Sequence, residues 1–206
     1  AVRAGEMTDG LVVRLWNRKG HAFRDEHTPP EIDITELTAL RLDLAACGVG
    51  DGSVLPWLTP SNEEHMGKAT ELLQKLGALD ANGDITEHGR AMAKLPLQPR
   101  HAHMVLRGCE MGNGLMSVQM AALLEDKDIL RGEERVDLRL RVRALWSCDP
   151  AMELKYDFIY PPVRFYFKEE EVERQRYIPK ATVDKTVVRR VNATVRQITT
   201  MLPAPV

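Results

Sequence analysis

The fold is decided by residues 60–106, which read PSNEEHMGKATELLQKLGALDANGDITEHGRAMAKLPLQPRHAHMVL. Ser61 and Asn62 stand before Glu63 and Glu64, an order typical of a helix N-terminus with a glutamate at its third position. The apolar residues that follow recur every three or four positions and so share one stripe: Met66, Ala69, Leu73 and Leu76. Gly77 can adopt the positive φ that commonly ends a helix. The pattern predicts an amphipathic helix between Ser61 and Gly77.

A hairpin is expected next, over residues 78–86. Asn82-Gly83 can take the positive φ angles of a tight turn between two short strands. Thr86 is a candidate N-cap for a second helix over residues 87–94. A helix, a hairpin and a helix in this order are how a small winged-helix unit is assembled.

Helices are also expected on both sides of this unit. Before it, apolar residues at helical spacing run from Glu36 to Cys47, and Gly48 ends the run. After it, Pro96 and Pro99 interrupt the chain before a helix beginning at Arg100. The apolar faces of this helix and of the next one are Ala102, Val105, Leu106 and Cys109, then Leu115, Val118, Ala122 and Leu123. We therefore expect a helical bundle behind the winged unit.

Two later segments extend the bundle. Residues 136–146 alternate apolar and charged side chains, as in a strand, but Leu138, Val142 and Leu145 also share a helical face. The abundance of Leu and Arg favours helix. The last helix is expected over residues 184–202, with one face formed by Val187, Val191, Val195, Ile198 and Leu202.

Other segments differ in character. Residues 11–16 form a strand-like run, expected to be the last strand of a fold that lies upstream, and residues 17–30 are expected to be a linker. Residues 50–60 are expected to be an ordered loop anchored by Leu55, Trp57 and Leu58. Seven of the eight Phe and Tyr residues lie within residues 150–178, for which a β-ribbon or an extended arm is expected.

Composition places the chain among ordinary globular proteins. It has 206 residues, a net charge of -2 and an apolar fraction of 44%, with no apolar run long enough to cross a membrane. We expect no membrane partner and a cytoplasmic location. The three cysteines are far apart, so we expect buried thiols rather than disulfides or a metal site. No P-loop, dinucleotide turn, zinc-protease motif or nucleophile elbow occurs, so the chain alone is not expected to be a catalyst.

Two basic helix faces are candidates for contact with nucleic-acid phosphates. One carries Arg135, Arg139 and Arg143, and the other carries Lys185, Arg189 and Arg196. The alternative is that both are solvated faces balanced by nearby acids, which are more numerous around the first set. The aromatic residues could stack unpaired bases or pack against one another. The second helix of the winged unit holds only Arg90 and Lys94, a small footprint for reading a DNA groove.

The chain resembles DEAH-type ATP-dependent helicases. Residues 2–5 (VRAG), the run 11–16 and residues 29–32 (PPEI) look like the end of their second RecA-like domain. Residues 72–80, His88–Ala93, Leu95–Leu97 and Pro99-Arg100 resemble their winged-helix domain entering the ratchet domain. The bacterial HrpB type is the nearest in pattern, through residues 123–128, 137–141 and 197–198.

This resemblance implies an accessory region that contacts single-stranded nucleic acid, RNA rather than DNA, and couples it to the RecA-like motor of the same polypeptide. Arg3 matches the arginine that reaches the ATP γ-phosphate in relatives and would stabilise the transferring phosphoryl group only with that motor. Glu6 stands where a second arginine is expected. ATP and Mg²⁺ are implied for the parent protein, and no cofactor or metal site is expected in this chain. The expected nucleic-acid-binding residues are Arg100, Arg139, Arg143, Arg189 and Arg196.

The expected fold class is mainly α, with a winged-helix domain at residues 31–98 and a ratchet-like helical bundle at 99–206 that carries the aromatic insertion at about 150–178. Residues 1–30 are expected to be the remnant of an α/β RecA-like domain and a linker. Two alternatives for function stay open at this point. One is a stand-alone winged-helix regulator that binds DNA, and the other is a protein-interaction module.

Overall fold

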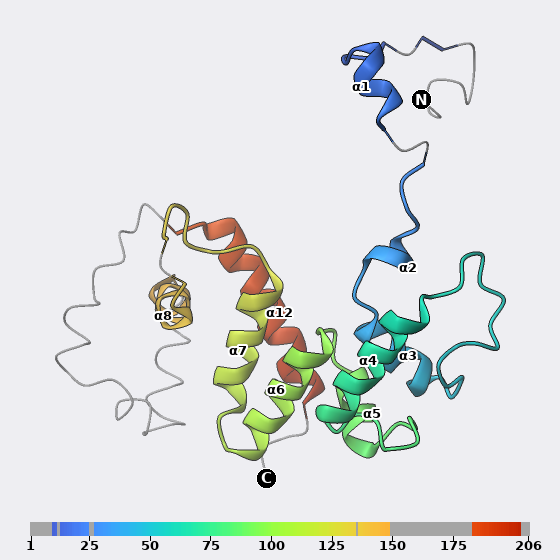
Figure 1. Cartoon of the computed structure of the whole chain (residues 1–206). Helices are drawn as coiled ribbons and strands as arrows, with labels where there is room; N and C mark the ends of the chain where they lie inside the picture. The colour runs from blue at the N-terminus through green and yellow to red at the C-terminus, as the bar shows by residue number, and fades with distance from the viewer. Residues whose placement is uncertain (1–9, 12, 25–26, 135, 149–182, 203–206) are drawn as a thin grey trace.

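A computed structural model describes residues 10–11, 13–24, 27–134, 136–148 and 183–202 of the chain. Within these ranges the regular elements are helices, and pairing between extended segments is limited to two isolated β-bridges. Figure 1 shows the helices, which are α1 Arg18–Ala22, α2 Glu31–Ile34, α3 Thr38–Ala46, α4 Glu63–Lys75, α5 Glu87–Ala93, α6 Pro99–Glu110, α7 Gly114–Glu125, α8 Leu138–Cys148 and α12 Lys185–Met201. The expectation of a mainly α fold is confirmed. The aromatic segment at 150–178 lies outside the described residues.

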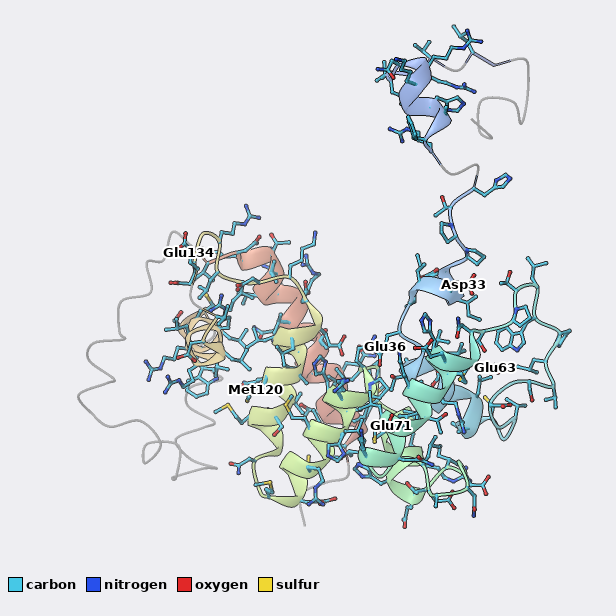
Figure 2. The ribbon with its side chains drawn as sticks, in the orientation of Figure 1. Asp33, Glu36, Glu63, Glu71, Met120 and Glu134 are labelled. Atoms are coloured by element: carbon cyan, nitrogen blue, oxygen red, sulfur yellow. The ribbon has the colours of Figure 1, made fainter. Side chains whose placement is uncertain are left out.

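Helix α4 begins and ends at the signals in its sequence. The side chain of Asn62 accepts a hydrogen bond from the backbone N–H of Glu64 at 2.8 Å, so Asn62 is the N-cap. Glu64 is therefore at the second helical position and not at the expected third, because the helix begins one residue later than the pattern predicts. At the other end Gly77 has a φ of 71°, and its N–H bonds to the carbonyl of Gln74 at 2.9 Å. Met66, Ala69 and Leu73 are buried, as the stripe predicts. Glu63 and Glu71, labelled in Figure 2, belong to the exposed face of α4.

The turn of the wing differs from the prediction. Gly83 has a φ of 85°, but among the described residues only glycines have a positive φ, so Asn82 does not share the left-handed conformation. Instead the carboxylate of Asp80 accepts hydrogen bonds from the N–H groups of Asn82 and Asp84, both at 2.9 Å. The two expected strands reduce to one antiparallel bridge between Leu79 and Ile85. The local sequence predicted the place of the turn correctly and its conformation wrongly, because the Asp80 side chain supplies a competing set of bonds.

Helix α5 sits directly on the base of this hairpin. Thr86 is its N-cap, as predicted, and its hydroxyl accepts from the N–H of Gly89 at 3.0 Å while donating to the carbonyl of Gly77 at 2.6 Å. A Cβ atom on Gly89 would lie 2.1 Å from the carbonyl oxygen of Ala78. Only glycine therefore allows α5 to approach the hairpin this closely.

The guanidinium of Arg41 joins the parts of the winged unit. Arg41 is only 4% exposed. Its guanidinium nitrogens donate hydrogen bonds to the hydroxyl of Thr70 at 3.1 Å, the carbonyl of Gly50 at 3.0 Å and the carbonyl of Gly83 at 2.9 Å. A buried charge is tolerated where it is hydrogen bonded, and Nε, Nη1 and Nη2 of Arg41 each make one such bond. One side chain from α3 thus connects α4, the loop after α3 and the turn of the wing.

Helix α7 is the centre of the bundle. It packs against α6, α8 and α12, and Figure 1 shows α7 and α12 side by side. The segment at 138–148 is helical, which confirms the preference for helix over strand, and Trp146 donates its Nε1–H to the buried Gln119 of α7 at 3.0 Å. The buried face of α12 consists of Val187, Val188, Val191, Val195 and Ile198. The spacing predicts this face apart from two differences: Val188 is added, and the expected Leu202 is the C-cap and only partly buried.

The hydrophobic core runs through the expected boundary between the two domains. Leu73 and Met92 of the winged unit belong to the same buried cluster as Val105 of α6 and Ile198 of α12. A smaller cluster of Leu37, Leu44, Met66 and Ala69 lies under the loop at residues 50–60, where Leu55 and Trp57 pack against it. The division at residue 98 stays a prediction, and the two parts share one apolar core.

Several expectations were wrong. The described residues of the run 11–16 form no strand, and Leu11 and Leu15 are 89% and 92% exposed, because a strand needs a hydrogen-bonded neighbour and the described chain offers none. The expected linker contains α1, which Asn17 caps through a bond from the N–H of Gly20 at 2.7 Å. Leu58 is fully exposed, so it does not help to anchor the loop at residues 50–60 as expected. Cys47 and Cys148 are also exposed and Cys109 is only partly buried, so the expectation of buried thiols was wrong.

Replacing Gly89 by Ala tests the contact between α5 and the hairpin. We expect the free energy of unfolding to fall by about 2–3 kcal/mol, because the new methyl group collides with a backbone carbonyl that cannot move independently. Gly67 in α4 is the matched control, since a Cβ there meets no atom within 4 Å. Gly67→Ala should raise stability by about 0.5–1 kcal/mol. Urea denaturation measures both, and equal effects would show that the close approach is absent.

Replacing Arg41 by Met tests the central guanidinium. The variant leaves the acceptors of Gly50, Gly83 and Thr70 without their donor, so we expect a loss of about 2–4 kcal/mol in the free energy of unfolding. Lys68→Met is the control, because the Lys68 side chain is 67% exposed and pairs only with Glu64 on the surface of α4. It should change stability by less than about 0.5 kcal/mol. A loss no larger at position 41 than at position 68 would contradict the role given to Arg41.

Candidate nucleic-acid interface

A basic stripe runs along the exposed side of α12. Lys185, Arg189 and Arg196 are exposed, and no acidic residue occurs between Lys185 and Met201. At 3.6 residues per turn these cations lie within an arc of about 40° and span about 16 Å of helix. The opposite face of α12 is buried against the bundle. The helix thus presents a row of positive charge while its packing face holds it in place.

The three cations of the basic stripe have no ion-pair partner within the described part of the chain. Their neighbour Arg190, by contrast, donates to both carboxylate oxygens of Asp126, at 2.9 Å and 2.6 Å. This hydrogen-bonded guanidinium lowers the pKa of Asp126 below its ordinary value. Arg190 therefore fastens α12 to the end of α7, and the basic stripe remains available to a ligand.

The start of α12 is held by a second arginine. Arg131 donates from Nε to the carboxylate of Asp184 at 2.9 Å, and the same carboxylate accepts from the N–H of Thr186 at 2.9 Å as the N-cap of α12. The N–H of Asp184 bonds in turn to the carbonyl of Ile129 at 2.8 Å. Asp184, the acid nearest the basic stripe in sequence, is thereby already bound to Arg131.

The two expected residues on α8 have a different environment. Arg139 is engaged with Asp137, with its Nη2 2.8 Å from a carboxylate oxygen, and this bond is the main cause of the lowered pKa of Asp137. The charge of Arg143 contributes to the same shift. Both arginines are balanced by an acid at the start of their own helix, so they are weaker candidates for phosphate contact than the residues on α12.

Arg100 lies apart from both sets, in the first turn of α6, where it is exposed and has no ion pair among the described residues. The same turn is bound to the end of α7, because Glu125 accepts from the N–H of Gln98 at 2.7 Å and lies 2.8 Å from Nδ1 of His101. Arg100 and the basic stripe thus stand on two helices that both pack against α7. Arg3 and Arg135 lie outside the described residues.

A shallow cavity of about 310 Å³ lies where α3 and α5 meet the segment leading into α6. Most of its lining residues are apolar by type, with Leu42, Met92 and Leu97 among them, and its charged members are Asp43 and Glu125. Carboxylates repel phosphate, so this cavity is not part of the nucleic-acid interface. Among the described residues, no group of three or more His, Cys, Asp or Glu side chains is arranged to hold a metal ion. None of the helices described is long and apolar enough to cross a membrane.

The sequence alone did not identify the aspartates that form ion pairs with particular arginines. Arg141 is buried, and its Nη2 donates to the carboxylate of Asp128 at 2.6 Å, which joins α8 to the segment after α7. The pairing of Arg190 with Asp126 spans 64 positions in sequence. The alternation of Asp and Lys at residues 126–128 is visible in the sequence, but nothing local tells which arginine each acid will bind.

Replacing Arg190 by Gln tests the bond to Asp126 through its pH dependence. A carboxyl whose pKa is lower in the folded state adds stability above its ordinary pKa of about 3.9, and this stability is lost as pH falls through the lower value. The wild type should therefore lose up to about 1 kcal/mol more than Arg190→Gln between pH 6 and pH 2.5, measured by urea denaturation. Arg189→Gln removes the same charge without an ion pair and should keep the wild-type dependence. The same loss in both variants would show that the bond does not form.

Part of the chain is similar to known proteins. Residues 69–97 match the winged-helix form of the helicase-associated domain HA2. The chain is 32% identical over 117 residues to the ATP-dependent RNA helicase HrpA homolog of Haemophilus influenzae, covering 53% of this chain and 9% of that protein. It is 31% identical over 115 residues to the ATP-dependent RNA helicase HrpA of Escherichia coli, covering 53% and 9%. It is 30% identical over 142 residues to the probable ATP-dependent RNA helicase DHR2 of Saccharomyces cerevisiae, covering 68% and 19%.

The chain thus spans less than a fifth of the length of these relatives. The matched winged-helix residues include the end of α4, the wing and α5, which are the elements that the Arg41 guanidinium and Gly89 hold together. The HrpB type expected from the sequence is not confirmed, since the relatives bear other names. The domain match and the relatives together support a C-terminal, helicase-associated region of the DEAH-box type.

Proposed function

We propose that this region contacts single-stranded RNA through the basic stripe of α12 and couples that contact to the RecA-like motor of a parent ATP-dependent helicase. The observation that carries the proposal is the row of Lys185, Arg189 and Arg196, exposed and without ion pairs in the described chain, in a protein similar to RNA helicases. Guanidinium groups bind phosphate strongly because they form charge-assisted, bidentate hydrogen bonds.

The spacing of the basic stripe suits a strand backbone. Its length of about 16 Å is enough to follow several consecutive phosphates, and its side chains are long enough to adjust to them. Contacts of this kind carry no base preference, because phosphates are the same at every position. A motor that moves along a strand needs such sequence-independent contact.

Arg100, Arg139 and Arg143 would have secondary roles in this proposal. Arg100 is free to extend the contact to α6, whereas Arg139 would have to exchange its bond to Asp137 for a phosphate. We also propose that the parent binds ATP and Mg²⁺ in its motor domains, that Arg3 acts there on the γ-phosphate, and that the protein is cytoplasmic. Stimulation of the parent's ATP hydrolysis by single-stranded RNA, and its loss in Arg189→Ala/Arg196→Ala, tests the coupling. A fall in hydrolysis both with and without RNA in Arg3→Ala tests the role of Arg3.

The HrpB type remains our proposal for the parent, on the strength of residues 123–128, 137–141 and 197–198. The structure gives some of these residues a shared role, since Asp126 and Asp128 bind Arg190 and Arg141. Placement of the parent's motor-domain sequence among the DEAH helicases tests this type, and a position among the HrpA proteins would reject it.

Binding to labelled RNA tests the proposed interface. In fluorescence anisotropy, we expect the chain to bind single-stranded RNA more tightly than duplex DNA, with an affinity that falls steeply with salt. Arg189→Ala/Arg196→Ala removes two phosphate contacts, so the slope of log affinity against log salt should become shallower by about 1.4, at about 0.7 for each contact.

The matched control is Lys68→Ala/Lys75→Ala, which removes two exposed cations from α4, each paired with a glutamate of the same helix. Its affinity and salt slope should stay near those of the wild type. Equal losses in the two double variants would show that only overall charge matters, and no binding at low salt would reject the basic stripe as the interface.

A further inference from the structure

Two histidines from different helices are directly hydrogen bonded at the junction of the winged unit and the bundle. Nε2 of His88 on α5 lies 2.9 Å from Nδ1 of His103 on α6. The rings meet edge to face, with centroids 5.1 Å apart and planes at 88°. This bond needs one ring nitrogen to carry a proton and the other to present a lone pair. It therefore forms only while at least one of the two imidazoles is neutral.

The surroundings of His88 disfavour its charged form. Burial is the main cause of its lowered pKa, and the nearby His103 acts in the same direction. Arg107 of α6 also lowers it, while Glu110 of α6 opposes the shift. Arg107 already donates to Glu110, so the carboxylate is largely committed to that arginine. The charged groups that act on His88 thus come from α6, the helix against which α5 is held.

The rest of this junction responds to pH differently. Most of it is apolar, since Met92 and Leu95 pack in the common core with Ala102 and Val105, and these side chains do not titrate. The other histidine contact, between His101 and Glu125, gains an ion pair when the imidazole is protonated. Of these two contacts, the one between His88 and His103 is the contact that acid breaks.

We propose that the hydrogen bond between His88 and His103 is a pH-sensitive latch that holds α5 of the winged unit against α6 of the bundle and releases it when both imidazoles are protonated. The direction follows from proton linkage. His88 takes up a proton more readily when the latch is open, so the closed form is fully favoured above the ordinary histidine pKa of about 6.5. It loses stability as pH falls below that value. The effect does not depend on nucleic-acid binding.

Amide hydrogen exchange of the full chain tests the latch. EDTA is present to remove trace metal ions that imidazoles bind, and the rates are corrected for the intrinsic pH dependence of exchange. Between pH 7.5 and pH 5.5 we expect the opening equilibrium of the α5 amides to rise by about three- to tenfold, with a smaller change in α7. His88→Gln keeps a neutral hydrogen-bonding side chain and should remove this pH dependence. His103→Gln removes the partner imidazole but keeps the buried His88, so it should reduce the dependence without abolishing it. Using both single variants guards against misfolding of either one.

His21→Gln is the matched control, because His21 is an exposed histidine on α1, and it should retain the wild-type response. Wild-type α5 amides that open equally at the two pH values would overturn the proposal. The same pH response in His88→Gln and His103→Gln as in the wild type would overturn it too, since another group would then be responsible.

Discussion

The winged unit depends on one buried guanidinium. Arg41 is placed in α3, yet its hydrogen bonds end on α4, on the loop at Gly50 and on the turn at Gly83. Thr70 lies in the middle of α4, whereas Gly50 and Gly83 belong to segments without regular structure. Because a buried charge must keep all of its partners, the guanidinium makes these positions interdependent. The wing is short, with a single β-bridge, and this contact from beneath replaces the support that a longer sheet would give.

Specific pairs of opposite charges also hold the helices of the bundle together. Arg190, Arg131 and Arg141 each bind an aspartate that is distant in sequence, and together they fasten α8 and α12 to the segment after α7. These aspartates are therefore unavailable to the basic stripe, and the positive potential along α12 is preserved. A net charge of -2 for the whole chain hides this separation. Local pairing, rather than overall charge, decides where a phosphate backbone would be attracted.

The junction of the two parts has two kinds of contact with different consequences. The apolar core runs through it without interruption, which favours movement of the winged unit and the bundle as one body. The histidine contact and the bonds from Glu125 are polar additions at the edge of that core. Such contacts can be made and broken at a smaller cost in free energy than the core, so they are where the relative position of α5 and α6 can be adjusted.

Local signals in the sequence determined most of the helices. The Thr86 cap, the positive φ of Gly77 and the apolar stripes of α4 and α12 were predictable, because each depends on residues within one or two turns. The start of α4 was predicted to within one residue. The candidate cations on α12 were also found from their spacing. The sequence alone also predicted the DEAH-type helicase region that the HA2 match and the RNA helicase relatives support.

Only the tertiary structure decided which charges are free. Arg189 and Arg190 are neighbours with the same chemistry, but one faces solvent and the other meets an aspartate 64 positions away. The role of Arg41, the close approach at Gly89 and the exposed state of Leu11 and Leu15 likewise depend on what lies beside them in space. The physical reason is the range of the interaction: caps and stripes are satisfied within a helix, whereas ion pairs, strand pairing and backbone contacts need a partner that only folding brings near.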